Sequence, residues 1–440
     1  MRPLYFLLYI VLNYMFRIVF SNLETRNAPT KRNNCAIIVS NHPSAFMDPL
    51  LIAGLQKPIV FFMTRSDVFK PFLRPVLWAA NMLPIYRNMD GVNATLKNKS
   101  VFEACFKILK RKRSPLLFGE GLTDDVFERK LKPLKKGAAR MAFGAMNKYN
   151  WELDLEVFCV GMNYEDPTRM RSKMLISNAA PIQVSKYKKL YEENADKAID
   201  QLTLDIENAI KGEITQIDNN EYFTMHEQVI RVTRKGMHTD DHDPKLSIKD
   251  RQQYSKKLAD QINTLAKTPT NSFLSLKDKL DGYFTALQHK KVENKHIFSL
   301  AKNGKISSSK NIAFLLMAWP FAILGIVLMG IPYWITKWFV ERTFKRKVFW
   351  LSVKMAIGML IGGVFNIGIA ALLYRFVYPN IWITLLYYFT VPAISFLIAY
   401  QYRMEYFEWR QKQKVKQFDL SNLVEKRNEL EKQINLVFRD

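Results

Sequence analysis

The sequence predicts an α/β domain with a mixed sheet flanked by helices, then a helical accessory region and finally a C-terminal helical membrane domain. Three observations predict this order. Between residues 25 and 185, short runs rich in β-branched and aromatic residues alternate with stretches of helical period. From about 186 to 310 the chain is polar, with few strand signals. Beyond residue 311, long apolar stretches follow.

The composition bounds the partners of the chain. It has 440 residues, of which 48% are hydrophobic, so more than one domain with a sizeable core can form. Its formal net charge of +25 predicts an anionic partner: nucleic acid, an acidic membrane surface or a phosphorylated substrate. We expect the membrane and no nucleic acid, because the apolar stretches are long and no basic motif is interleaved with aromatic residues.

The cysteines indicate the redox environment. Cys35, Cys105 and Cys159 are odd in number and lack the spacing of metal ligands. This usage disfavours a disulfide framework and is typical of a reducing compartment. We therefore expect core thiols.

The N-terminal region, residues 1–24, predicts an interfacial or membrane-associated helix. Residues 3 to 16 carry no charge but are followed at once by Arg17. They are too few to cross roughly 30 Å of hydrocarbon as a straight helix. A cleaved signal peptide is disfavoured, because the following SNLETRN lacks a run of small residues suited to cleavage.

The α/β domain over residues 25–185 contains strand-like runs separated by a long helical stretch. The predicted strands are CAIIVS, PIVFFMT, MLPIYR, PLLFGE and LEVFCVGMNY, and the helical stretch is TLKNKSVFEACFKILKRK. After this domain, the amphipathic pieces LTLDIENAIKGEI and YSKKLADQINTLA predict an accessory region of helices over residues 186–310.

Three apolar stretches predict the membrane segments of residues 311–402. Residues 312 to 336, 348 to 374 and 381 to 402 each meet or exceed the roughly 20 residues that a membrane helix needs. We therefore expect an integral membrane protein.

The distribution of basic residues predicts the topology. Lysines and arginines flank the apolar stretches except at the loop of residues 375 to 380. The positive-inside tendency favours a hairpin of the second and third stretches, with that loop outside and all else, the α/β domain included, on the cytoplasmic side. The first stretch would return to its own side as a broken segment, which Pro320 and Pro332 permit. Three plain spans with the tail outside are the alternative.

Residues 403–440 predict a basic, amphipathic helical tail. Leu423, Leu430 and Ile434 have heptad-like spacing, which Arg427 interrupts. A helix that packs on its own protein and a short coiled coil are both open.

The stretch NHPSAFMD places two chemically active side chains, His42 and Asp48, six positions apart. In a continuous helix, residues six apart lie about 240° apart around the axis, so His42 must precede the helix. We expect a helix from about 45 to 55 with Ser44 as its cap, and Asp48 reaching back to the imidazole. A carboxylate on one ring nitrogen raises the basicity of the other. A purely structural pair is the alternative.

Three further stretches end in residues suited to binding. Arg87 follows a predicted strand, where its guanidinium could fork to a phosphate; a surface arginine is the alternative. Glu120 and Gly121 follow a second predicted strand, in a turn that permits close approach of a ligand; a plain turn is the alternative. In CVGMNY, only Gly161 and Tyr164 stand out from a core strand.

One motif looks like a metal site. HTDDHDP, residues 238 to 244, has two histidines four apart among aspartates, but no third histidine is nearby. We expect no metal there.

In order, NHPSAFMD, NMLPIYR, FGEGLTD and CVGMNY resemble the four motifs of the phospholipid/glycerol acyltransferase (PlsC-like) superfamily, over roughly residues 30 to 185. Five residues separate the histidine from the aspartate, where most of the superfamily has four. This spacing is similar to the glycerol-3-phosphate/dihydroxyacetone-phosphate acyltransferase branch. Asn81 stands where the second motif usually has Gly, and Gly119 where the third has Pro. Asp124 stands where many members have Arg, which leaves Arg87 as the main candidate for phosphate binding.

The resemblance implies an α/β acyltransferase domain and direct acyl transfer without a covalent acyl-enzyme. His42 would deprotonate the acceptor hydroxyl and Asp48 would orient His42. The glycerol phosphate would be held by Arg87, Glu120, Gly121 and Asn41. The donor would be an acyl thioester, either acyl-CoA or acyl carrier protein, with no cofactor and no metal.

The acceptor and the enzymatic role each have an alternative. The resemblance implies acyl transfer to glycerol 3-phosphate in glycerophospholipid synthesis at the membrane; 1-acylglycerol 3-phosphate or another lysophospholipid is the other acceptor. A non-catalytic membrane scaffold that binds anionic lipid is the non-enzyme alternative. The sequence does not indicate an oligomeric state.

Overall fold

The computed structural model describes residues 3–31, 33, 35–86, 94–121 and 123–438. The chain divides into two compact units, one ending at Gln216 and one beginning at Ile217. We call them the first and the second unit. We expected the α/β domain to end at residue 185, so the first unit extends further than the sequence indicated.

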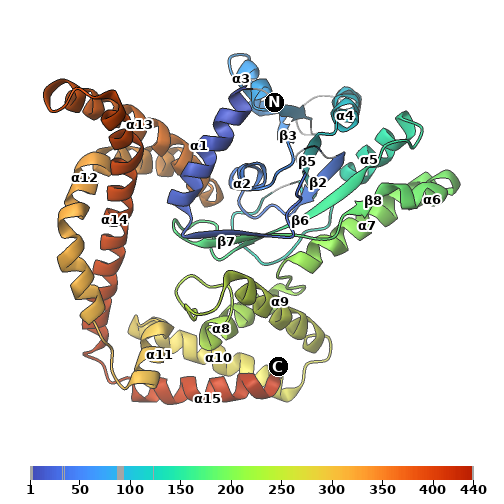
Figure 1. Ribbon diagram of the computed structural model, residues 1–440. Helices are drawn as coiled ribbons and strands as arrows, with labels where there is room; N and C mark the ends of the chain where they lie inside the picture. The colour runs from blue at the N-terminus through green and yellow to red at the C-terminus, as the bar shows by residue number, and fades with distance from the viewer. Residues whose placement is uncertain (1–2, 32, 34, 87–93, 122, 439–440) are drawn as a thin grey trace. The chain divides into compact units, whose positions relative to one another are not determined.

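The first unit is built on an eight-stranded mixed sheet in the order β1-β7-β6-β2-β5-β3-β4, with β8 paired to β6 (Figure 1). Strands β2 to β5 are parallel to their neighbours, whereas β6 is antiparallel to β7 and β8. The strands are β1 (Asn22–Arg26), β2 (Ala36–Ser40), β3 (Val60–Arg65), β4 (Met82–Ile85), β5 (Ser114–Phe118), β6 (Glu156–Tyr164), β7 (Lys173–Asn178) and β8 (Ile182–Gln183).

Helices connect these strands, and the predicted α/β class with flanking helices is confirmed. The helices are α1 (Pro3–Val19), α2 (Met47–Leu55), α3 (Arg74–Ala79), α4 (Ala94–Lys110), α5 (Gly137–Lys148), α6 (Lys188–Glu193) and α7 (Ala195–Glu213). Two 3-10 turns, η1 (Ser66–Val68) and η3 (Val184–Tyr187), complete this unit as described.

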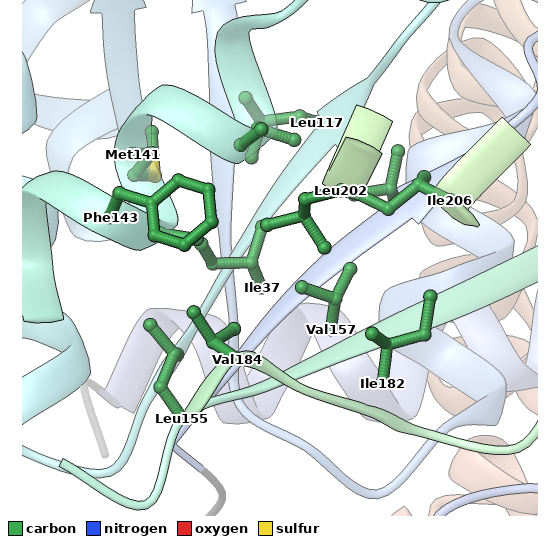
Figure 2. Close-up of a cluster of buried hydrophobic side chains, with 14 of the residues drawn as sticks. Ile37, Leu117, Met141, Phe143, Leu155, Val157, Ile182, Val184, Leu202 and Ile206 are labelled. Atoms are coloured by element: carbon green, nitrogen blue, oxygen red, sulfur yellow. The ribbon is translucent and has the colours of Figure 1, made fainter. Parts of the chain in front are cut away.

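The core of the first unit lies between the sheet and the helices α4, α5 and α7. Figure 2 shows Ile37, Leu117 and Val157 of the sheet packed with side chains of α5 and α7. All five residues of β2 are buried, because a central parallel strand is covered on both faces. Strand β2 therefore reads as a continuous apolar run, and the site residues that follow it are anchored in the core.

Helix α7 explains why the first unit extends to Gln216. Its buried stripe, Ala198, Leu202, Ile206 and Ile210, belongs to the same core as the sheet. The polar composition of this segment looked like an accessory region, but a helix with one apolar stripe packs on whatever apolar surface covers that stripe.

Helix α1 packs one face on its own unit. Phe16, 1% exposed, lies against Gly54 of α2, and Asn13 donates to the Gly54 carbonyl at 2.9 Å. Phe6, Leu7 and Ile10 are each about half exposed (49%, 57% and 51%), on the other face. Helix α1 therefore has exposed apolar side chains, and its place at a membrane interface stays a prediction.

The second unit begins with a helical region and ends with a helix that packs back on it. The helices are α8 (Phe223–Thr233), α9 (Ile248–Leu265), α10 (Asn271–Lys290), α11 (Asn294–Asn303) and the C-terminal α15 (Ser421–Val437), with a 3-10 turn η4 (Asn220–Tyr222) before α8. Leu423, Leu430 and Ile434 of α15 are buried with residues of α8 and α10. Arg427, 2% exposed, donates to the Val232 carbonyl at 2.5 Å. The tail therefore packs on its own protein.

The stretch HTDDHDP forms a polar loop between α8 and α9. Asp241 is 1% exposed and pairs with Arg231 at 2.9 Å and with Arg234 at 3.6 Å. His238 Nδ1 accepts the Asp241 backbone N–H at 3.0 Å. Within the described ranges, no group of three or more His, Cys, Asp or Glu side chains could hold a metal ion.

Among the described residues, three helices of the second unit are long and apolar enough to cross a membrane, which agrees with the predicted C-terminal helical membrane region. They are α12 (Ser309–Thr343), α13 (Trp350–Phe376) and α14 (Ile381–Val415), with the turn η5 (Lys347–Phe349) before α13. Pro320 and Pro332 lie inside α12, and Pro392 lies inside α14. The Leu328 carbonyl, which Pro332 leaves without its helical donor, accepts from Asn366 of α13 at 3.3 Å.

The closest antiparallel pair is α12 with α14 (Figure 1). Gly325 of α12 lies directly against the backbone of Ser395. At one end of the pair, Asn311 contacts Glu405 at 2.5 Å and Lys412 at 2.9 Å. Small residues at a helix crossing let two backbones approach closely, which explains the choice of pair.

Candidate active site

The dyad forms where β2 ends and α2 begins. His42 follows β2 after one residue, and Asp48 is the second residue of α2. His42 Nδ1 and Asp48 Oδ2 are 2.9 Å apart. The imidazole also stacks on the Phe118 ring, with 3.9 Å between the centroids and 16° between the planes. These two contacts fix the ring and leave Nε2 as the nitrogen that can act on a substrate.

The start of α2 differs from the expected one. We expected Ser44 to cap a helix from about residue 45, but α2 begins at Met47 and has no side-chain cap. Ala45 has a φ of 42°, a left-handed conformation that cannot continue into a helix. The Ser44 backbone N–H instead donates to Asp48 Oδ2 at 2.8 Å. The turn thus directs a donor at the carboxylate that holds His42.

Asp48 is fully buried and receives three hydrogen bonds. Besides His42 and the Ser44 N–H, the Tyr164 hydroxyl donates to Oδ1 at 2.7 Å. A buried carboxylate is costly unless donors satisfy it, and bonds to a charged acceptor are among the strongest in proteins. Burial, and then the neighbouring Asp48, raises the pKa of Tyr164 well above its usual value, so Tyr164 stays a donor. Sequence analysis had singled out Tyr164 without giving it a role.

Glu120 connects the turn after β5 to the dyad. Its Oε1 accepts the His42 backbone N–H at 2.7 Å, and its Oε2 accepts from Lys132 N at 3.4 Å. Burial raises the pKa of Glu120, while these two backbone donors oppose the rise. The carboxylate therefore positions the backbone of His42 in addition to facing the pocket described below.

The glycine after Glu120 makes this turn possible. Gly121 has a φ of 76°, which side-chain-bearing residues rarely adopt. A Cβ at this position would also lie 2.5 Å from Lys135 Nζ. The lysine amine therefore lies directly over the Gly121 backbone.

Asn41 and Gly161 fix the strand ends around the dyad. Asn41 Nδ2 donates to the Met162 carbonyl at 3.2 Å, and its Oδ1 accepts the Met162 N–H at 2.8 Å. A Cβ on Gly161 would lie 2.9 Å from the Glu213 carbonyl oxygen at the end of α7. Both amide atoms of Asn41 thus bind backbone, Asn41 also lines the pocket described below, and substrate binding by Asn41 stays a prediction.

The candidate site is a pocket at this end of the sheet. His42, Glu120, Arg129, Asn163, Tyr164 and Thr215 are among the residues that line it. Arg87, the main expected phosphate ligand, lies outside the described residues. Arg129 was not predicted: no local signal distinguishes it from the other charged residues of its loop, and only the fold brings it to the pocket.

Part of the first unit is similar to a known family. Residues 17–162 match the family model described as Acyltransferase, which covers less than half of the chain. One similar solved structure is the 1-acyl-sn-glycerophosphate (LPA) acyltransferase PlsC from Thermotoga maritima, at 19% identity and a TM-score of 0.30. The similarity covers 44% of this chain and 79% of that chain. No curated protein matches the chain.

Proposed function

We propose that this chain is a membrane-bound acyltransferase that moves a fatty acyl group from an acyl thioester to a hydroxyl of glycerol 3-phosphate. One observation carries the proposal: the 2.9 Å contact between His42 Nδ1 and a buried Asp48, beside a pocket, in a domain that matches the Acyltransferase family. The five-residue spacing between these two side chains favours glycerol 3-phosphate over a lysophospholipid.

In the proposed reaction, His42 is the general base. The acceptor O–H bond breaks as its proton moves to Nε2, and the oxygen forms a bond to the thioester carbonyl carbon. The C–S bond then breaks, and the departing thiolate takes the proton from Nε2. Asp48 stabilises the imidazolium that exists between the two proton transfers. The Ser44 N–H and the Tyr164 hydroxyl hold the Asp48 carboxylate in place.

Direct transfer also fits the state of the thiols. Burial raises the pKa of Cys105 and of Cys159 to about 12, and burial followed by Asp154 raises that of Cys35 to about 11. A thiol must ionise to act as a nucleophile. None of these cysteines is therefore suited to carry an acyl group.

The acceptor would occupy the pocket beside His42. We assign Glu120, Gly121 and Asn41 to its lining or support, and Arg87 to its phosphate, as the family motifs imply. Glu120 would accept from a glycerol hydroxyl while holding the His42 backbone. The donor, acyl-CoA or acyl carrier protein, and the cytoplasmic position of the domain belong to the same proposal.

The test is an acceptor panel. The purified full chain, in lipid nanodiscs, is incubated with labelled acyl-CoA or acyl carrier protein and either glycerol 3-phosphate, 1-acylglycerol 3-phosphate or another lysophospholipid. We expect transfer to glycerol 3-phosphate and a loss of about 10² to 10⁴ in rate for His42→Ala. His289→Ala, an exposed histidine on α10, is the matched control.

Three outcomes decide between the functions. Transfer only to a lysophospholipid would assign the alternative acceptor. Binding to anionic vesicles without His42-dependent product from any acceptor would leave a membrane scaffold and reject the enzyme. An unchanged rate in His42→Ala would reject the assigned base.

A further inference from the structure

The connection between β3 and β4, residues 66–81, contains α3 and has large apolar side chains on its surface (Figure 1). Phe72 is 77% exposed and Val76 is 54% exposed. Helical hydrogen bonding begins before α3, because the Arg74 N–H donates to the Lys70 carbonyl at 3.0 Å. Residues four apart in a helical turn lie on one face. Phe72 and Val76 therefore form one outward-facing apolar patch.

The opposite side of this connection is fixed to the sheet. Leu73 and Leu77 are partly buried. At the end of the connection, Asn81 is 3% exposed, and its carbonyl accepts the Phe62 N–H of β3 at 2.9 Å. Its Nδ2 also donates to the Val60 carbonyl at 3.4 Å. The apolar patch therefore belongs to an anchored segment and keeps its outward direction.

The connection leaves the sheet at the edge that carries the candidate site. Strand β5 is parallel to both β2 and β3, so these three strands end at the same edge. His42 follows β2 and Glu120 follows β5, and the connection begins directly after β3. A surface that binds this connection would therefore also lie near the edge where we place the reaction.

Basic residues accompany the apolar patch. Residues 68–86 include Lys70 and Arg74, both exposed, and contain no Asp or Glu. Arg74 lines a shallow hollow together with Pro75 and Trp78. Apolar side chains beside lysine and arginine are typical of segments that bind anionic bilayers, where the apolar groups enter the interface and the cations reach lipid phosphates.

Exposure of an apolar side chain alone does not indicate such a surface, as α7 shows. Leu204 of α7 is 50% exposed, but Asp200, Asp205 and Glu207 lie within four positions of it. These carboxylates would oppose contact with an anionic bilayer. Single exposed apolar residues are ordinary on protein surfaces, whereas a group of them beside basic residues indicates a partner.

We propose that the connection between β3 and β4 binds the surface of an anionic phospholipid bilayer, with Phe72 and Val76 in the interface and Lys70 and Arg74 on lipid phosphates. The inference rests on the proposed function for the attachment of the chain to a membrane, and names a second contact with that membrane. Three helices long and apolar enough to cross a bilayer keep the chain near lipid. A two-fold contact between copies would instead bring the same basic residues together.

Photochemical cross-linking of the full chain tests the contact. Benzoylphenylalanine, a photoreactive amino acid, replaces Phe72, or Val76 in a second variant, and the protein is placed in nanodiscs with labelled phosphatidylglycerol. Illumination should give lipid adducts at both positions. The same amino acid in place of Leu204 is the matched control, and its adduct yield should be about threefold lower or less.

Charge variants test the choice of an anionic lipid. Lys70→Gln combined with Arg74→Gln should lower the adduct yield at Phe72 about threefold or more, because both cations would lie at the lipid phosphates. Replacing phosphatidylglycerol by labelled phosphatidylcholine should lower the yield similarly. Arg140→Gln combined with Lys189→Gln, exposed residues of α5 and α6, removes the same charge elsewhere and should leave the yield unchanged.

Three results would overturn the proposal. The first is adducts of Phe72 and Val76 with a second copy of the chain in place of lipid. The second is a lipid yield at both positions that does not exceed the yield at Leu204. The third is a yield that neither the Lys70 and Arg74 substitutions nor the change of lipid lowers, which would reject an anionic surface.

Failure of this inference is distinguishable from failure of the proposed function, because cross-linking requires no acyl transfer. A wild type with His42-dependent transfer whose Phe72 and Val76 variants give no lipid adducts rejects this membrane contact alone. A wild type without His42-dependent transfer rejects the proposed reaction, and lipid adducts at the two positions would still support the contact.

Discussion

The side chain of Asp48 shows how the fold prepares a single residue for chemistry. It is fully buried, and a ring nitrogen, a backbone N–H and a phenol satisfy it. An arginine partner would also hold the carboxylate, but it would withdraw negative charge from the imidazole. Neutral donors keep the carboxylate in place while leaving it charged toward His42.

Tyr164→Phe should reduce turnover without affecting substrate binding. The variant removes a bond to a charged group worth about 1.5–3 kcal/mol, so kcat should fall about 10- to 100-fold if that bond serves only to hold the dyad. KM should stay within about twofold of wild type.

Tyr187→Phe is the matched control for this prediction. Its hydroxyl also donates to an aspartate, Asp205, but in contact with α7 and away from the pocket. Steady-state kinetics are the measurement. A Tyr164→Phe enzyme that is less stable but keeps the kcat of wild type would contradict a positioning role.

The sequence could predict half of the site. The helical phase placed His42 ahead of a helix and Asp48 in its first turns, because both residues belong to one local segment. Tyr164 reaches Asp48 across 116 positions, and Arg129 reaches the pocket through a loop without regular structure. Such contacts depend on strand order, which no local pattern contains. The left-handed Ala45 was equally invisible and explains the wrong cap at Ser44.

Among the elements, the crossing of α12 and α14 depends on one small residue. A Cβ on Gly325 would lie 2.6 Å from the Ser395 carbonyl carbon and 2.9 Å from Ala399 Cβ. Backbone atoms cannot move aside as a flexible side chain can. The two helices would therefore have to separate, and the packing that holds the pair would be lost along its length.

Gly325→Ala should lower the free energy of unfolding of the membrane domain by about 1–3 kcal/mol, the usual cost of overpacking. Unfolding by SDS titration from mixed micelles measures it. Gly330→Ala on the same helix is the control, because its Cβ would meet only Ile326 Cγ2 at 3.4 Å. It should be neutral or slightly stabilising, since Ala favours a helix over Gly. Equal effects of the two substitutions would show that the crossing is not tight at Gly325.

The predictability of the elements followed their apolar content. The five predicted strands are present because buried parallel strands are continuous apolar runs. Strand β1, with the polar sequence NLETR, was not predicted; it lies at the edge of the sheet and pairs with β7 alone. Strand β7 was missed because its apolar core, residues 174 to 176, is too short to distinguish from other structure.

At the scale of the molecule, the start of α12 and the end of α14 lie next to each other in the second unit. Asn311, near the start of α12, contacts Lys412, near the end of α14, and Ser308 contacts Gln413 at 3.2 Å. Two contacting ends cannot lie on opposite faces of a bilayer. If α12 and α14 both cross, the chain crosses an even number of times. Three plain spans are then excluded, and the loop of residues 377 to 380 lies opposite to the tail.

Cysteine accessibility tests this topology. With the three native cysteines replaced by alanine, single cysteines at Ser307, Tyr378 and Ser421 are labelled in sealed vesicles with a membrane-impermeant maleimide. We expect Ser307→Cys and Ser421→Cys to react from the same side and Tyr378→Cys from the other. Labelling of Ser307→Cys and Ser421→Cys from opposite sides would establish an odd number of crossings.

The boundary of the first unit was the least predictable feature of the whole chain. Residues 186 to 216 have the composition of an accessory region, yet α7 buries its stripe in the core of the sheet. The sequence shows that a helix has an apolar stripe but does not identify the surface that covers the stripe. Because the core of the sheet covers the stripe of α7, the first unit extends to Gln216.

Helix α15 follows α14 in the chain and packs on the helical region that precedes α12, so this region is attached to the membrane helices at two points. The helical region of residues 217 to 308 is joined covalently to α12 and, through Arg427 and its apolar neighbours, non-covalently to the segment that follows α14. A helical region linked to the membrane helices by one connection could rotate about that connection, whereas a second attachment restricts this rotation. The helical region therefore holds a set orientation relative to its membrane pair, and severing the short connection before α15 would leave it free to turn.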